Sequence, residues 1–242
     1  MANLATLRIL EGLSGFLLVD KPAGIAFSSV VKTVKRKFNL VKVGHGGSLD
    51  ASASGLLVLM VNDANRFTSD VMGADRSWEG TMRLGMKTNT HDVNGERVEG
   101  ADPAKIPSPE RIAEVLPEFL GDVFQTESRW CAVRREGSAA YEIADTGGHK
   151  PFMAHVYRFE PRPPVSPDGV LGFSLKGTKG LIVRTFVNDF GDALGCGAAL
   201  ASLRRTAVGR FEVANAVKFE ALLETDIADF APLVVPVSKF FA

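Results

Sequence analysis

Mostly apolar runs and apolar residues at helical spacing follow one another from the start of the chain. Gly15–Asp20 is a mostly apolar run that ends at a Lys-Pro turn and predicts a buried strand, and Leu56–Val61 is a second continuous apolar run. A helix is predicted between them, from a cap at Ser28 or Ser29 to about Phe38. Its apolar stripe consists of Val30, Val31, Val34 and Phe38.

The middle of the chain is expected to contain a helix, a strand and a hairpin. Ala64–Met72 has a helical pattern, and Trp78–Leu84 alternates enough between apolar and polar residues to be a strand. Asn94-Gly95 is a hairpin-turn signal that would link Lys87–Val93 with Glu96–Glu99.

A further amphipathic helix is predicted to begin at Ser108-Pro109-Glu110, because proline favours the first helical position, and to end at Gly121. Its core-facing stripe consists of Ile112, Val115, Leu116, Phe119 and Leu120. The segment of about residues 127–152 begins with an irregular, charged pattern, and we expect a mobile, partly looped insertion there.

The C-terminal half is expected to add strands, one helix and a connection rich in proline. The connection is Arg158–Pro167, and the helix is Thr185–Leu194, ending at Gly195. The predicted strands are Val170–Leu175, Leu181–Arg184 and Ala198–Arg205. Because strands and helices mix without a regular β-α-β order, the sequence predicts an α+β fold with a mixed, mostly antiparallel sheet flanked by helices and loops.

The composition is that of an ordinary globular protein, with 45% hydrophobic and 23% charged residues among 242. We expect one domain over residues 1–242. The sequence holds no uncharged apolar stretch of about 18 residues and no signal-peptide pattern, so no membrane association is expected. Cys131 and Cys196 form neither a metal signature nor a disulfide framework, which fits a reducing, cytoplasmic location.

The formal net charge is zero, which disfavours nucleic acid as a partner, but the charges are segregated along the chain. Residues 28–45 contain five basic residues and no acid, and residues 171–211 contain six basic residues and two acids. The last stretch, from Glu212 onward, is acidic. A neutral total therefore conceals two basic segments that could form one face.

The most informative loop is Gly44-His45-Gly46-Gly47-Ser48-Leu49-Asp50. Asp50 is the only acidic or basic residue between His45 and Ser52, and an apolar run follows soon after it. A single carboxylate held in such a loop suits a nucleophile or a general base, although an aspartate that caps the next element has the same pattern. A phosphate cradle or a hydrolase loop is disfavoured, because the sequence contains neither a P-loop nor a Gly-x-Ser-x-Gly elbow.

Read together with other motifs, this loop resembles the TruB family of pseudouridine synthases. The matching pieces are GFLLVDKPAG, GHGGSLD followed by ASASGLL, RLG at Arg83–Gly85, GLIVRT at Gly180–Thr185, LGCG, and LRR with Arg204 and Arg205. They recur in order over roughly the first 210 residues. The resemblance implies the pseudouridine synthase fold and isomerisation of uridine 55 in the T-loop of transfer RNA, with no cofactor and no metal.

The same resemblance implies roles for individual residues. Asp50 would be the nucleophile that attacks either the sugar or the base, Arg184 its counter-ion, and Trp78 the platform on which the uracil stacks. The remaining residues expected to bind substrate are His45, Gly46, Gly47, Lys21, Ile182, Arg204 and Arg205, although the Lys-Pro motif at Lys21 is expected chiefly to support the loop. The expected partner is the T-stem-loop of tRNA, gripped partly by the insertion at about 127–152, and the expected state is a monomer.

Several positions depart from the family pattern. Ala51 stands where the family has proline, and Trp78 and Ile182 stand where it commonly has tyrosine. Near the insertion, Glu127, Cys131 and Arg134 replace the usual proline, serine and lysine. We expect no C-terminal PUA-like RNA-binding domain of the kind that many members of the family carry. An indole can stack on a base but cannot accept a proton as a phenolate does. The alternative function is therefore a catalytically weak or inactive TruB-like RNA-binding protein, and the RNA hairpin that it acts on stays open.

Overall fold

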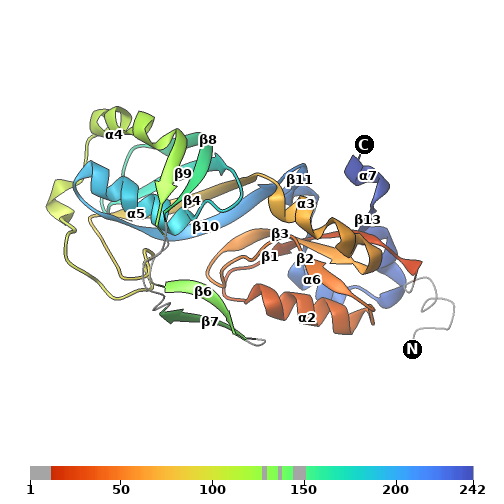
Figure 1. The fold of residues 1–242 in the computed structure, drawn as a ribbon. Coiled ribbons are helices and arrows are strands. Elements are labelled where there is room, and N and C mark those ends of the chain that lie inside the picture. The colour runs from red at the N-terminus through yellow and green to blue at the C-terminus, as the bar shows by residue number, and fades with distance from the viewer. Residues whose placement is uncertain (1–11, 127–129, 136–137, 144–150, 242) are drawn as a thin grey trace. The chain divides into compact units, whose positions relative to one another are not determined.

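The computed structural model describes residues 12–126, 130–135, 138–143 and 151–241 (Figure 1). The chain forms two compact units. Residues 1–76 and 204–242 make up the first unit, and residues 77–203 make up the second. Whether these units act as the single catalytic domain predicted for residues 1–242 stays a prediction.

The first unit is built on two long antiparallel strands, β1 (Gly15–Lys21) and β3 (Ser54–Val61), which pair along their whole length. Shorter strands extend this pair. β12 (Val217–Lys218) is parallel to β1, while β13 (Val234–Pro236) and β2 (Val43–His45) are antiparallel to β1 and β3 respectively. The C-terminal part of β10 (Ala198–Val208) lies parallel to β3 and pairs with β11 (Phe211–Glu212).

Both faces of the β1–β3 pair are buried, which explains the continuous apolar runs in their sequences. One face packs against α2 (Phe27–Lys37) and α6 (Phe219–Glu224), and its core includes Leu17, Val34 and Phe38. The other face packs against a 3-10 helix (Asn62–Phe67) and α3 (Thr68–Gly73). A short helix, α7 (Ser238–Phe241), follows β13.

The predicted N-cap of α2 was wrong by two or three residues. The N-cap is Ala26, whose carbonyl accepts hydrogen bonds from the amides of Ser29 and Val30 at 3.0 and 3.3 Å. Ser28 and Ser29 therefore lie inside the first turn. The predicted apolar stripe is confirmed in its main positions, since Val30, Val34 and Phe38 are buried.

The second unit contains a sheet of strand order β10-β4-β9-β8-β5. Its other strands are β4 (Arg76–Leu84), β5 (Gly121–Gln125), β8 (Phe152–Arg162) and β9 (Val170–Gly177). β8 is antiparallel to both of its neighbours, so the predicted mixed, mostly antiparallel sheet is confirmed.

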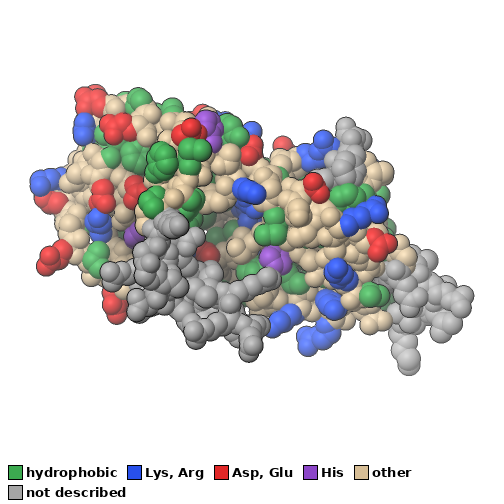
Figure 2. All heavy atoms as spheres, in the orientation of Figure 1, with side chains coloured by type: hydrophobic (Ala, Val, Ile, Leu, Met, Phe, Trp, Pro, Cys, Tyr) green, Lys and Arg blue, Asp and Glu red, His purple; other side chains and the backbone are tan. Residues whose placement is uncertain are grey.

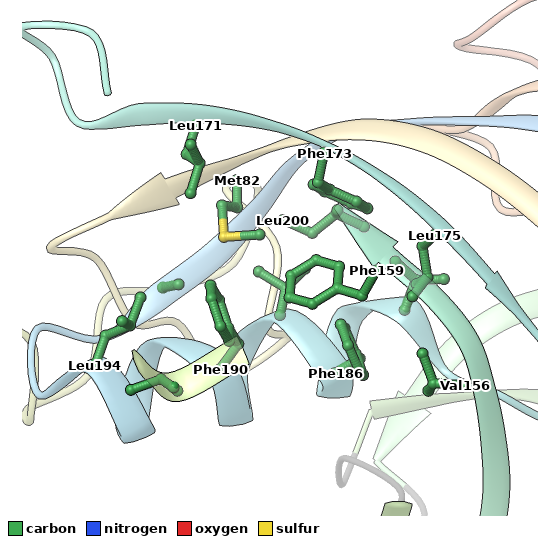
Figure 3. Close-up of a cluster of buried hydrophobic side chains, with 14 of the residues drawn as sticks. Met82, Val156, Phe159, Leu171, Phe173, Leu175, Phe186, Phe190, Leu194 and Leu200 are labelled. Atoms are coloured by element: carbon green, nitrogen blue, oxygen red, sulfur yellow. The ribbon is translucent and has the colours of Figure 1, made fainter. Parts of the chain in front are cut away.

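The described residues of the second unit also contain α4 (Pro109–Val115), which a 3-10 turn (Leu116–Phe119) follows, and α5 (Val183–Leu194). Ser108 caps α4 as predicted, because its hydroxyl accepts from the Arg111 amide. The core lies between α5 and the sheet, where Phe186 and Phe190 of α5 meet Phe159 of β8 edge to face (Figure 3).

Two predictions in this unit were wrong. Leu181–Arg184 is not a strand, because α5 already begins at Val183. The β-branched residues there suggested a strand, but Val183, Phe186, Val187 and Phe190 are all buried at helical spacing. Arg158–Pro167 is not only a surface connection, since β8 continues to Arg162 and its Phe159 is 2% exposed.

The predicted hairpin at Asn94-Gly95 is reduced to a turn with one isolated antiparallel bridge, Thr88 to Arg97. The segment predicted as a partly looped insertion contains a two-stranded antiparallel sheet of β6 (Trp130–Arg135) and β7 (Ser138–Ile143), and its role as an insertion that binds RNA stays a prediction. The rest of Glu127–Gly148 lies outside the described residues. No helix among the described residues is long and apolar enough to span a membrane.

Candidate active site

The loop between β2 and β3 carries Asp50, and it packs so closely against its neighbours that glycine is required at two positions. A Cβ on Gly46 would lie 2.3 Å from Val71 Cγ1. Gly47 adopts a φ of +123°, a conformation that favours glycine, and a Cβ there would meet the Arg76 side chain at 2.9 Å. The glycines therefore let the loop lie against α3 and the start of β4, and their predicted substrate contacts stay predictions.

Two buried cations hold the main chain on either side of Asp50. Lys21 is 0% exposed and donates to the carbonyls of Pro22, Ile25 and Ala51 at 2.8, 2.9 and 3.4 Å. Arg205 is 2% exposed and donates to the carbonyl of Ser48 at 2.8 Å. The residue after Asp50 and the residue two before it are therefore both fixed by a positive side chain.

Burial lowers the pKa of the Lys21 ammonium to about 8, and the negative charge of Asp50 opposes this shift. The pKa of the Arg205 guanidinium is lowered to about 9, chiefly by burial and then by the charge of Arg76, and Asp50 again opposes the shift. An ionised Asp50 thus stabilises both cations.

These contacts agree with the expectation that Lys21 supports the loop. Both Lys21 and Arg205 are buried and bind loop carbonyls, so nothing here supports the substrate contacts expected of them, which stay predictions. Arg204 differs from them, because it forms a bidentate ion pair with Asp20 at 2.9 and 2.7 Å while its side chain remains 40% exposed. A phosphate contact by Arg204 therefore stays a prediction.

His45 lies at the end of β2, with its ring centroid 4.9 Å from that of Phe27. Its Nδ1 accepts a hydrogen bond from the Gly47 amide at 3.3 Å, so the neutral ring carries its proton on Nε2. This tautomer fits the predicted role as a donor that positions substrate. On the neighbouring α2, basic side chains gather at the surface (Figure 2), and Lys32, Lys35 and Arg36 are exposed there.

In the second unit, Arg184 lies in the first turn of α5 and is 9% exposed. Its Nη1 donates to the carbonyl of Thr90 at 2.9 Å. The Thr90 loop is fixed in turn by Asp92, whose Oδ1 accepts from the Thr90 hydroxyl and the Asn94 amide, both at 2.9 Å. Arg184 thus binds a loop with little freedom of its own.

The Thr88–Asp92 loop was not identified from the sequence as a support for Arg184. His91 in it has a φ of +62°, and its pKa is lowered by burial first and by the charge of Arg184 second. The only sequence signal was the Asn94-Gly95 turn, which pointed to a hairpin and not to a support for Arg184.

The other predicted pocket residues of this unit are Trp78 and Ile182. Trp78 is 5% exposed and belongs to the hydrophobic core, so its ring has a fixed orientation and little accessible surface. Ile182 is half-buried and forms the N-cap of α5. Asp50 belongs to the first unit and Arg184 to the second. Their pairing stays a prediction, as does stacking on Trp78.

Among the described residues, no group of three or more His, Cys, Asp or Glu side chains is arranged to hold a metal ion. Cys196 is buried and free, and burial raises the pKa of its thiol.

Two family models match the chain. The model of the TruB family pseudouridylate synthase N-terminal domain matches residues 35–160, and that of the tRNA pseudouridylate synthase B C-terminal domain matches residues 184–238. The tRNA pseudouridine synthase B of Opitutus terrae is 35% identical over 228 residues, which cover 93% of each chain. That of Burkholderia pseudomallei is 38% identical over 215 residues, covering 88% of this chain and 70% of the relative.

Solved structures show the same fold. A Cbf5-Nop10-Gar1 complex contains a chain that matches with a TM-score of 0.73 at 21% identity, over 96% of this chain and 63% of that one. The archaeal box H/ACA sRNP Nop10-Cbf5 complex matches with a TM-score of 0.64 at 23% identity, over 90% and 55%. The present chain therefore spans between about half and two thirds of the chains in these structures.

Proposed function

The chain belongs to the TruB family of pseudouridylate synthases, and on that basis we propose that it is a tRNA pseudouridine synthase that isomerises the T-loop uridine with Asp50 as nucleophile. The observation that carries the proposal is that the main chain on both sides of Asp50 is fixed in place. The loop around it is fixed on both sides by the buried cations Lys21 and Arg205. Relatives named tRNA pseudouridine synthase B that match nearly the whole chain support the choice of RNA.

The reaction breaks the bond between ribose C1′ and uracil N1 and forms a bond between C1′ and C5. The freed base turns in place, the C5 proton leaves, and N1 ends with a proton, so atoms and electrons balance without a cofactor. Asp50 attacks the sugar or the base, and Arg184 keeps the carboxylate charged and oriented. Trp78 and Ile182 line the base, and the closed pocket retains it during its rotation.

RNA affinity comes mainly from cations that face solvent. Lys32, Lys35 and Arg36 on α2 are exposed, and Arg204 is half-exposed. They would contact phosphates, while His45 donates to the RNA near the flipped nucleotide and Gly46 and Gly47 let the backbone approach. Extruding the uridine from its stack costs about a few kcal/mol, which contacts in the pocket regain.

A second candidate function is an RNA-binding protein of this fold with weak or no turnover. The position of Trp78 favours it, because an indole that is 5% exposed offers little stacking surface and no phenolate to accept the C5 proton. In an active enzyme, water or another group would take that proton. The fixed main chain around Asp50 favours catalytic turnover, so we retain the synthase as the proposed function.

An assay of a T-stem-loop RNA separates the two functions. Wild-type protein and the Asp50→Ala variant are compared for binding and for pseudouridine formation. The enzyme converts the uridine only with Asp50 in place, whereas binding by both proteins without conversion by either establishes the second function. A different RNA hairpin as substrate would appear as conversion elsewhere in total RNA. The monomeric state and the cytoplasmic location stay predictions.

A further inference from the structure

Gln125 is a buried polar residue with no role in the reaction described above. It is the last residue of β5 and is 2% exposed. Its carboxamide makes two hydrogen bonds to one residue 57 positions away: Oε1 accepts from the Ile182 amide at 2.9 Å, and Nε2 donates to the Ile182 carbonyl at 3.1 Å. A side chain that pairs with both main-chain groups of one residue acts as a strand neighbour would, and it fixes the backbone of that residue.

The fixed residue is the one from which α5 begins. Ile182 is the N-cap of the helix, and an isoleucine side chain has no oxygen with which to cap it. Its carbonyl already accepts from the Phe186 amide at 2.9 Å, so the Gln125 amide is a second donor to the same oxygen. Gln125 therefore satisfies, from another strand, both main-chain groups of the residue at which α5 begins, although it does not pair with the first helical amides as an N-cap side chain would.

Arg184 follows two residues later, in the first turn of α5. Its Nη1 donates to the Thr90 carbonyl, on a loop that Asp92 fixes. The guanidinium is thus held at its tip by Thr90, while Gln125 holds the backbone from which it projects. Gln125 also pairs with Phe152 of β8, and this is the final residue pair of the β5–β8 ladder. The segment 126–151 joins these two residues.

We propose that Gln125 is a positioning residue of the synthase, which sets the backbone of Ile182 and thereby the placement of the Ile182 and Arg184 side chains for catalysis. The inference rests on the proposed function. It assigns no contact with substrate to Gln125. Its effect falls on the chemical step and not on RNA affinity, because the phosphate-binding cations lie on other elements.

The test compares Gln125→Met, Gln125→Glu and a control, Ser166→Ala, which removes the hydrogen bond that the Ser166 hydroxyl accepts from the Val170 amide at the start of β9. Gln125→Met keeps the length of the side chain but makes neither hydrogen bond. We expect the single-turnover rate on a T-stem-loop to fall on the order of 10- to 100-fold, with RNA affinity changed less than about threefold. Ser166→Ala keeps the wild-type rate. Equal rates for Gln125→Met and Ser166→Ala overturn the proposal.

Gln125→Glu gives a signature that a purely structural role would not. A protonated carboxyl group reproduces both hydrogen bonds, whereas a carboxylate has no donor and repels the Ile182 carbonyl. The rate of this variant relative to wild type should therefore fall on the order of tenfold between about pH 5 and pH 8, with the protein folded throughout. A ratio that does not change with pH contradicts the proposal, even if Gln125→Met does not fold.

Amide hydrogen exchange provides a readout that does not depend on activity. In wild-type protein the Ile182 amide is hydrogen-bonded and should exchange slowly. In Gln125→Glu its protection against exchange should be lost as the pH rises. Comparison with wild type at each pH removes the intrinsic effect of pH on the exchange rate. Unchanged protection overturns the inference. A wild-type protein that converts no T-loop uridine defeats the proposed function instead, and the exchange experiment still decides whether the pairing exists.

Discussion

Arg205 on β10 donates from Nη1 to the carbonyl of Ser48 across 2.8 Å and so ties the sheet of the first unit to the loop that carries Asp50. The same guanidinium donates from Nε to the carbonyl of Leu56 at 2.8 Å. β10 can pass this close to β3 because Gly55 has a φ of +102° and no Cβ, which would lie 2.3 Å from the Arg205 carbonyl oxygen. The position of Asp50 therefore depends on residues more than 150 positions away.

Replacing Arg205 by methionine should destabilise the protein by about 2–4 kcal/mol, because the carbonyls of Ser48 and Leu56 lose their donors. The control is Arg204→Met, which removes a partly exposed ion pair with Asp20 and should cost about 1 kcal/mol or less. Urea unfolding of both variants measures the difference. Equal losses would show that Arg205 does not hold the loop as described.

Lys21→Met tests the buried ammonium through the pH dependence of stability. The folded-state pKa of Lys21 is about 8, below its ordinary value of 10.5, because of burial. Between these values the unfolded chain keeps a proton that the folded protein has lost, so this group makes the free energy of unfolding rise with pH. The methionine variant lacks that contribution. The free energy of unfolding of the variant is expected to lie below that of wild type, and this difference should widen by about 1–2 kcal/mol between about pH 7 and pH 10.

Urea unfolding at the two pH values measures this widening. The comparison with wild type cancels the titration of all other groups. A deficit that stays constant or narrows with rising pH would show that Lys21 is not buried as a cation beside Asp50.

The order and type of the elements could be predicted where the sequence carried a local signal. The apolar runs of β1 and β3, the Ser108 cap of α4 and the stripe of α2 are such signals. Prediction failed where tertiary packing decided between two local readings. Leu181–Arg184 looks like a strand in isolation, and only burial of Val183 and Phe186 against the sheet makes it the start of a helix.

The site was predictable from motifs but not from geometry. Asp50 and His45 could be singled out by their loop, whereas the burial of Lys21 and Arg205 depends on strands brought together by the fold. A basic residue near a glycine loop is equally consistent with a phosphate contact or with a structural cation. The roles of Gln125 and of the Thr90 loop could not be predicted from the sequence, because their partners Ile182 and Arg184 are distant in the chain.

Trp78→Tyr should keep or raise the rate of conversion, because a phenol can both stack on the uracil and take part in proton transfer. The smaller ring leaves a space in the core of the second unit, so stability should fall by about 1–2 kcal/mol. Single-turnover conversion and urea unfolding give the two numbers. A large loss of rate without unfolding would mean that the indole has a role of its own.

Asp50→Asn should abolish conversion while RNA affinity stays within about threefold of wild type, because the amide keeps the shape of the carboxyl group but is not a nucleophile. Filter binding and pseudouridine detection on the same T-stem-loop measure both properties. A conversion rate close to that of wild type would remove Asp50 from the proposed mechanism.

The central claim is that this chain makes pseudouridine in the T-loop of transfer RNA through Asp50. Mapping pseudouridine at nucleotide resolution in total RNA tests it most directly, in cells that carry the wild-type gene, lack it, or carry the Asp50→Asn variant. We predict that the T-loop pseudouridine disappears without the gene, returns with the wild type and does not return with the variant. A T-loop pseudouridine that persists without the gene, or that the variant restores, would contradict the claim.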